Sequence, residues 1–156
     1  MKRWIVYGAA LAAAVCLTGN RSAGIDVGKL EPIEVVRINV TGLNVRIETD
    51  TGRKGAGRSL EMAVMDMKRS ADRELFLDTA DYLLIDKEGV DLMAELAEML
   101  RPSCKVCLEN GEAELEGVGA FLTIHDPKMT LLEYRKTRQV LPKLLTVEGR
   151  MYLVQP

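Results

Sequence analysis

The change of periodicity that decides the fold lies in residues 33–70, IEVVRINVTGLNVRIETDTGRKGAGRSLEMAVMDMKRS. In the first part of this stretch, apolar residues alternate with polar ones on both sides of the turn signal Thr41-Gly42. One run carries Val36, Ile38 and Val40 on a single face, and the alternation resumes in residues 43–47. Two runs of period two around a glycine turn predict a β-hairpin.

The period then changes to that of a helix. From Ser59 the apolar residues fall at i, i+3, i+4 and i+7, as Leu60, Ala63, Val64 and Met67. This spacing predicts an amphipathic helix to about Ser70, and Ser59 is a suitable N-cap. The domain is therefore expected to begin with a hairpin followed by a helix that packs on it.

Strand and helix signals continue to alternate down the chain. Apolar runs predict strands at 82–85 and 105–108, and a closing hairpin at 144–154 around Glu148-Gly149. Helical spacing predicts further helices at 92–100, from 113 to the stop at Asp126-Pro127, and at 130–138, the last with Thr130 and Glu133 as a capping box. This order favours an α+β domain with a mixed β-sheet and about four helices. The residues expected to be buried together are Leu60, Val64, Met67, Leu83, Ile85, Leu92, Leu96 and Val106.

The N-terminus has the pattern of an export signal. Lys2 and Arg3 precede an uncharged apolar run from Trp4 to Leu17, and polar residues follow at once. A run of this length is typical of a signal peptide and is short for a membrane-spanning helix. We therefore expect residues 1–19 to be a signal peptide or membrane anchor helix, 20–31 a polar linker and 32–156 a single α+β domain. The positive end favours an extracytoplasmic location, with the domain anchored at the cell membrane.

Three fates remain open for the N-terminal segment. Cys16 stands where the lipidated cysteine of a lipoprotein would lie, although Val15 precedes it in place of the usual small residue. The segment could also remain as an uncleaved anchor, or be removed after the small residues Ala12-Ala13-Ala14. Cys16 is therefore the candidate lipidation site.

Composition narrows the class of partner. The formal net charge is −2 and aromatic residues make up only 4% of the chain. A slightly acidic chain with few aromatic residues has neither the basic surface nor the stacking platforms that nucleic acid requires. We predict no nucleic-acid partner and no cofactor.

Cys104-Lys105-Val106-Cys107 is a C-x-x-C motif. In an exported protein it could be a redox pair, a structural disulfide or half of a zinc site. The segment reads as extended, however, and in a strand the two Cα atoms would lie about 10 Å apart, too far for a disulfide. No second C-x-x-C or paired histidine completes a metal site. Buried, unpaired thiols are favoured, and a disulfide around a local turn remains the alternative.

Other chemical signals favour structural roles. Residues 52–59 nearly match a phosphate-binding loop, but Arg58 stands where that loop has its lysine, so a flexible basic loop is favoured. His125 is the only histidine, and the sequence has no nucleophile elbow to accompany it. Asp78, Asp81 and Asp86 lack the spacing of a calcium loop. We therefore predict no catalytic residues and no metal site.

One stretch carries a family resemblance. Residues 76–90, FLDTADYLLIDKEGV, preceded by the helix from Ser59, resemble the N-terminal domain of the Ger(x)C family of spore-germination lipoproteins. The resemblance covers residues 30–125 and includes the early hairpin and the segment from Val106 to Leu115. Asp78-Thr79 replaces the usual Gly-His of the family, and its long C-terminal domain has no counterpart here.

This resemblance implies a non-enzymatic, membrane-associated accessory or truncated relative of a spore germinant-receptor subunit. Its expected partners are the membrane, through the N-terminal segment, and membrane-protein subunits of a germination receptor. Two alternatives stay open. One is an exported thiol–disulfide protein that uses Cys104 and Cys107, which would require Cys104 to open a helix. The other is a secreted small-ligand-binding domain with a deep apolar pocket.

Overall fold

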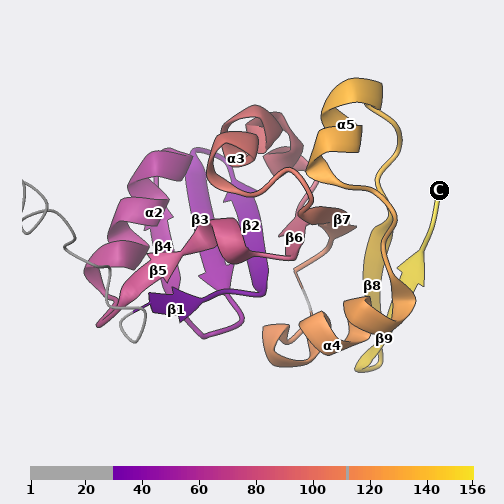
Figure 1. Cartoon of the computed structure of the whole chain (residues 1–156), viewed down its shortest axis with the longest axis horizontal. Coiled ribbons are helices and arrows are strands. Elements are labelled where there is room, and N and C mark those ends of the chain that lie inside the picture. The colour runs from indigo at the N-terminus through magenta and orange to yellow at the C-terminus, as the bar shows by residue number, and fades with distance from the viewer. Residues whose placement is uncertain (1–29, 112) are drawn as a thin grey trace, which may run out of the picture.

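The computed structural model describes residues 30–111 and 113–156, and its centre is a sheet of seven strands (Figure 1). The strand order is β4-β3-β2-β6-β7-β8-β9. The strands are β2 (Val35–Thr41), β3 (Asn44–Thr49), β4 (Lys54–Gly57), β6 (Tyr82–Ile85), β7 (Lys105–Glu109), β8 (Lys143–Val147) and β9 (Arg150–Val154). Two further strands, β1 (Leu30–Pro32) and β5 (Glu74–Phe76), pair in parallel as a separate small sheet.

The main sheet is mixed. Its four central strands, β2, β6, β7 and β8, run parallel, whereas β3 and β4 at one end and β9 at the other are antiparallel to their neighbours. Both antiparallel ends come from hairpins, because β2–β3 and β8–β9 are each joined by a two-residue turn that contains a glycine with positive φ, Gly42 or Gly149.

Helices cover both faces of the sheet (Figure 1). The α-helices α2 (Leu60–Arg69), α3 (Met93–Met99) and α5 (Leu131–Thr137) contribute to the hydrophobic cluster on one face, here called the helix-rich face. The helix α4 (Leu115–His125) packs on the other, here called the α4 face. Two 3-10 helices, η2 (Leu77–Thr79) and η3 (Glu88–Leu92), connect strands and helices on the helix-rich side.

The core follows from strand alternation. In β6 all four residues are buried: Leu83 and Ile85 on the helix-rich face, Tyr82 and Leu84 on the α4 face. A central parallel strand covered on both sides is expected to be apolar throughout. The predicted core is confirmed for Leu60, Val64, Met67, Leu83, Ile85, Leu96 and Val106, whereas Leu92 is only partly buried against it.

Within the described residues, the prediction of an α+β domain with a mixed sheet and four α-helices is confirmed. The two predicted helix N-caps are also present. Ser59 accepts a hydrogen bond from the Met62 amide at the start of α2, and Thr130 and Glu133 form a complete capping box at the start of α5. The predicted signal or anchor helix, residues 1–19 with Cys16, lies outside the described residues. None of the described helices is long and apolar enough to cross a membrane.

The larger differences from the predicted boundaries are three. Residues 52–59 are predicted as a flexible loop, but Lys54–Gly57 form β4 by pairing with β3. Glycine stands at positions 55 and 57 because a Cβ there would lie less than 3 Å from atoms of α2. Leu30 and Glu31 belong to β1 and not to the linker. The helix predicted at 92–100 begins as the 3-10 helix η3 at Glu88.

Candidate functional site

The two cysteines of the C-x-x-C motif do not meet. Cys104 immediately precedes β7 and belongs to the cluster on the helix-rich face, whereas Cys107 lies within β7 and belongs to the α4 face. Both thiols are free and fully buried. Burial raises the pKa of each thiol to about 12. Because Cys104 precedes a strand and both thiols are protonated at neutral pH, this geometry does not favour a redox centre.

Two basic residues of segment 52–59 form ion pairs with carboxylates. Arg53 forms a two-pronged ion pair with Glu31, through Nε at 3.2 Å and Nη2 at 3.0 Å, and this arginine lowers the pKa of Glu31. Lys54 lies 2.6 Å from a carboxylate oxygen of Glu48 on the neighbouring strand. The arrangement is that of an edge strand tied to its neighbours and not of a phosphate cradle.

The histidine and two of the three aspartates have local structural contacts. His125 is the last residue of α4, and its ring lies 4.2 Å from that of Phe121. Asp86 accepts hydrogen bonds from the amides of Val40 and Gly89, which fixes the turn after β6. Asp81 forms an ion pair with Arg101. In the described part of the chain no three His, Cys, Asp or Glu residues come together as metal ligands.

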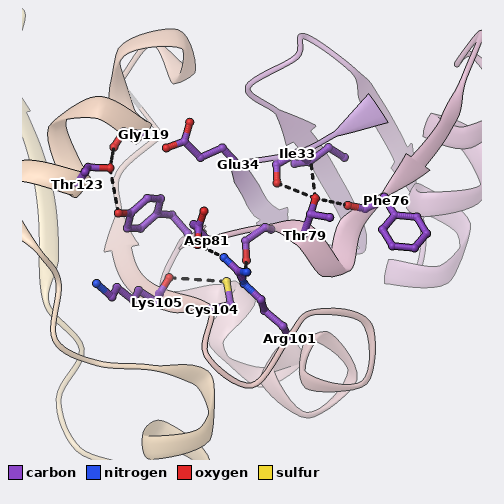
Figure 2. A network of polar contacts seen from close by, with 12 residues as sticks. Ile33, Glu34, Phe76, Thr79, Asp81, Arg101, Cys104, Lys105, Gly119 and Thr123 are labelled. Carbon is purple, nitrogen blue, oxygen red and sulfur yellow. Dashed lines mark hydrogen bonds and ion pairs between the residues drawn. The ribbon is translucent and has the colours of Figure 1, made fainter. Parts of the chain in front are cut away.

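A polar network ties the amino ends of β2, β6 and β7 together (Figure 2). The Glu34 carbonyl accepts hydrogen bonds from the amides of Asp81 and Tyr82, and the Lys105 amide donates to the Asp81 carbonyl. The guanidinium of Arg101 donates to the Ala80 carbonyl at 3.1 Å. This network fixes strand register, and no local sequence pattern indicates it because its members lie far apart along the chain.

The Tyr82 hydroxyl extends this network to the α4 face. It lies 3.2 Å from the Thr123 hydroxyl of α4, which donates to the Gly119 carbonyl (Figure 2). A Cβ on Gly119 would lie 2.7 Å from the Glu34 carboxyl carbon, so the exposed Glu34 side chain would have to shift to admit one. The contact holds α4 against the start of β2 and β6.

A buried ion pair, missed by the sequence analysis, lies on the α4 face. Arg37 of β2 donates from Nε and Nη2 to the two carboxylate oxygens of Glu109, each at 2.8 Å. The same guanidinium donates to the Ala113 carbonyl and lies 3.4 Å from Glu48. In the sequence Arg37 reads as an outward residue of an alternating strand. Its partner is 72 positions away, so only the fold reveals the pair.

A hollow of about 410 Å³ adjoins this ion pair over β2, β3 and β4. Its lining includes basic side chains, Arg37, Arg46 and Lys54, and acidic ones, Glu48 and Asp66. This hollow differs from the deep apolar pocket expected of a small-ligand-binding domain, because most of its lining residues are charged or polar.

The most distinctive surface is an exposed apolar patch on the closing hairpin. Leu145 and Val147 of β8 and Tyr152 and Val154 of β9 are 37%, 54%, 49% and 47% exposed. They share one side of the hairpin, because Leu145 pairs with Tyr152 and Val147 with Arg150. This set of four residues is called the hairpin face below. The hairpin face lies on the helix-rich side of the sheet. Leu108 is on that side and pairs with Lys143, which in turn pairs with Val154 of the hairpin face.

Lys143 and Arg150 border the hairpin face. Lys143 pairs with Val154 and Arg150 with Val147, both on the same side of the hairpin as the four apolar residues. The opposite side of the hairpin is different, because Leu144 is buried and Met151 and Leu153 pack against the α4 cluster. An exposed apolar surface on one side of a well-packed hairpin is a feature of binding sites for other macromolecules.

The fold therefore defines a small α+β domain with helices on both faces of a mixed sheet and, at one end, an apolar surface that no other element of residues 30–111 and 113–156 covers. The chain matches no protein-family model, no curated protein and no solved structure.

Proposed function

We propose that this protein is an exported, membrane-tethered domain that acts by binding another protein and not by catalysis. The observation that supports a binding role is the hairpin face, four exposed apolar side chains bordered by Lys143 and Arg150. The tether rests on the sequence: a positive start at Lys2 and Arg3, an uncharged apolar run from Trp4 to Leu17, and polar residues after it.

The spacer between tether and domain supports this arrangement. The stretch from Thr18 to Lys29 is largely polar and glycine-containing, and β1 begins at Leu30. A flexible linker of about a dozen residues has a root-mean-square reach on the order of 20 Å. With a spacer of that reach, the domain would contact the extracytoplasmic part of a neighbouring membrane protein while remaining anchored.

We propose that the protein takes part in spore germination, as an accessory or truncated relative of a germinant-receptor subunit. The support is the resemblance of residues 76–90 to the germination lipoproteins. The segment contains β6, whose four residues are all buried, so much of the likeness lies in core residues. Genomic neighbourhood tests this part of the proposal: adjacent sporulation or germination genes would support it, and adjacent redox or cell-wall enzymes would count against it.

The tether is tested by fractionating cells that express the full chain and its Cys16→Ser variant. If Cys16 is lipidated, the wild-type protein is in the membrane fraction with added acyl mass, and the variant loses that mass and its processing. If the segment is an uncleaved anchor, both proteins stay in the membrane at full length. Wild-type protein wholly in the soluble extracellular fraction, starting near residue 15, would refute the tether.

A further inference from the structure

The two edges of the main sheet are protected to different degrees. At the β4 edge the Ala56 amide donates to the Asp66 carboxylate of α2 at 3.0 Å, and α2 lies directly against Gly55 and Gly57. At the other edge, β9 pairs only with β8 among the strands of residues 30–111 and 113–156. An unprotected edge strand offers backbone groups for pairing with another strand.

The turn of the hairpin determines which backbone groups of β9 point outward. Glu148 and Gly149 have φ of 51° and 75°, the conformation of a two-residue type I′ turn. In such hairpins the flanking pair, here Val147 and Arg150, exchanges both hydrogen bonds, and bonded pairs then alternate along the ladder. The amides and carbonyls of Arg150, Tyr152 and Val154 therefore face β8, and those of Met151 and Leu153 face outward.

This edge is complementary to itself. If two β9 strands pair antiparallel around Tyr152, Met151 of each copy lies opposite Leu153 of the other, and the outward-facing amides and carbonyls of both residues form hydrogen bonds. Arg150 then lies opposite Val154 of the other copy, so no like charges oppose each other. Tyr152 lies opposite its own counterpart, and its other neighbour is Leu145.

We propose that the occupant of the β9 edge is a second copy of this chain, paired antiparallel through β9 around Tyr152. The pairing joins the two sheets into one and extends the hairpin face across the twofold axis as a row of Leu145, Tyr152 and their counterparts. This inference goes beyond the proposed binding function, because the pairing uses the backbone edge of β9 and leaves the hairpin face exposed to another protein. A five-residue strand gives a short interface, and anchoring in one membrane raises the effective concentration of the copies.

Cysteine cross-linking of the full chain in membranes tests the pairing and its register. Directly opposed, non-hydrogen-bonded residues have Cα atoms about 4.5 Å apart, within the range of a disulfide. Tyr152→Cys should form a disulfide dimer under mild oxidation. Arg150→Cys and Val154→Cys should cross-link when co-expressed and not when expressed singly. Met151→Cys is the matched control, because its side chain lies on the other side of the strand and opposite Leu153.

A charge at the twofold axis gives the second measurement. Tyr152→Lys places two like charges opposite each other and should weaken dimerisation roughly fivefold or more in sedimentation of detergent-solubilised full chain. Ile124→Lys, at a position 79% exposed on α4, is the control and should dimerise like wild type.

Three results would overturn the self-pairing. The first is Tyr152→Cys protein that melts cooperatively but stays monomeric under oxidation. The second is cross-linking of Tyr152→Cys to a different protein in place of its own copy. The third is equal dimerisation of Tyr152→Lys and wild type. Failure of the tether is distinguishable, since it appears as soluble protein in fractionation whatever the cross-linking result.

Discussion

Arg37 reaches across strand β6 to pair with Glu109, so that one buried guanidinium joins β2 to the end of β7. The two side chains are only 7% and 1% exposed, and both oxygens of Glu109 are engaged by the same guanidinium at 2.8 Å. Glu109 also accepts from the Ala113 amide, while the Ala113 carbonyl accepts from Arg37. The pair therefore fixes the backbone of Ala113, just before α4.

Removing one partner of this pair should cost more than removing both. Arg37→Ala leaves Glu109 buried without a counter-ion, and we expect the free energy of unfolding to fall by about 3 to 5 kcal/mol. The double variant Arg37→Met, Glu109→Leu should recover most of this loss, because no buried charge is left unpaired. Urea unfolding of the full chain measures both. A double variant less stable than Arg37→Ala would contradict this reading.

A charge in the centre of β6 should unfold the domain. Leu84 is fully buried on the α4 face, and an unpaired carboxylate there costs several kcal/mol, comparable with the whole stability of a small domain. We expect Leu84→Asp, and likewise Ile85→Asp, to lose the cooperative thermal transition. Leu43→Asp is the control, since Leu43 is 86% exposed, and it should melt like wild type.

The buried thiols should make stability depend on alkaline pH. An unfolded thiol loses its proton near pH 9, whereas burial raises the pKa of Cys104 and Cys107 to about 12. The folded protein therefore binds more protons than the unfolded chain in this window, and the free energy of unfolding falls as the pH rises through it.

The double variant Cys104→Ala, Cys107→Ala isolates this effect. Between pH 9.5 and 11, roughly, its free energy of unfolding should fall less steeply than that of wild type, by at most about 1.4 kcal/mol per pH unit for each thiol. Urea titrations at several pH values measure the two slopes. Equal slopes would mean that the thiols are not buried as described.

Two glycines should respond in opposite ways to alanine. At Gly55 a Cβ would lie 2.6 Å from the Met67 backbone nitrogen, so Gly55→Ala must push α2 from the sheet, at about 1 to 3 kcal/mol. At Gly117 the nearest contact would be the Met151 methyl at 3.8 Å. Gly117→Ala should therefore stabilise the domain by about 0.5 to 1 kcal/mol through helix propensity. Thermal melting distinguishes them, and similar shifts would contradict the packing.

Local patterns predicted much of the fold because they involve neighbouring residues. The run Tyr82–Ile85 is a strand with the predicted bounds, and the Thr130–Glu133 capping box is formed as the spacing indicated. Strand β4 was missed because its glycines read as a loop. They are required by the approach of α2, a tertiary contact that the local pattern does not contain.

The candidate site was harder to predict, since it depends on which elements become neighbours. The closing hairpin was predicted, but the local pattern did not indicate which of its sides is exposed. The side with Tyr152 is exposed because the hydrophobic cluster on the helix-rich face lies over the other strands. Cys104 and Cys107 also depend on the tertiary fold. They lie in different hydrophobic clusters because helices cover both faces of the sheet, which the spacing of the motif alone does not indicate.

The continuity of β2, β3, β4 and α2 along the chain has a consequence for the order of folding. Their contacts join residues close in sequence, so they form with little loop-closure entropy, whereas pairing of β2 with β6 must wait for a long loop to close. We expect residues 35–69 to be structured in the folding transition state. The C-terminal hairpin is itself local, but it should join the sheet later, because its pairing with β7 links residues far apart in the chain. Destabilising substitutions in α2 should then mainly slow folding, and those in β8 and β9 should mainly hasten unfolding, as stopped-flow φ-values would measure.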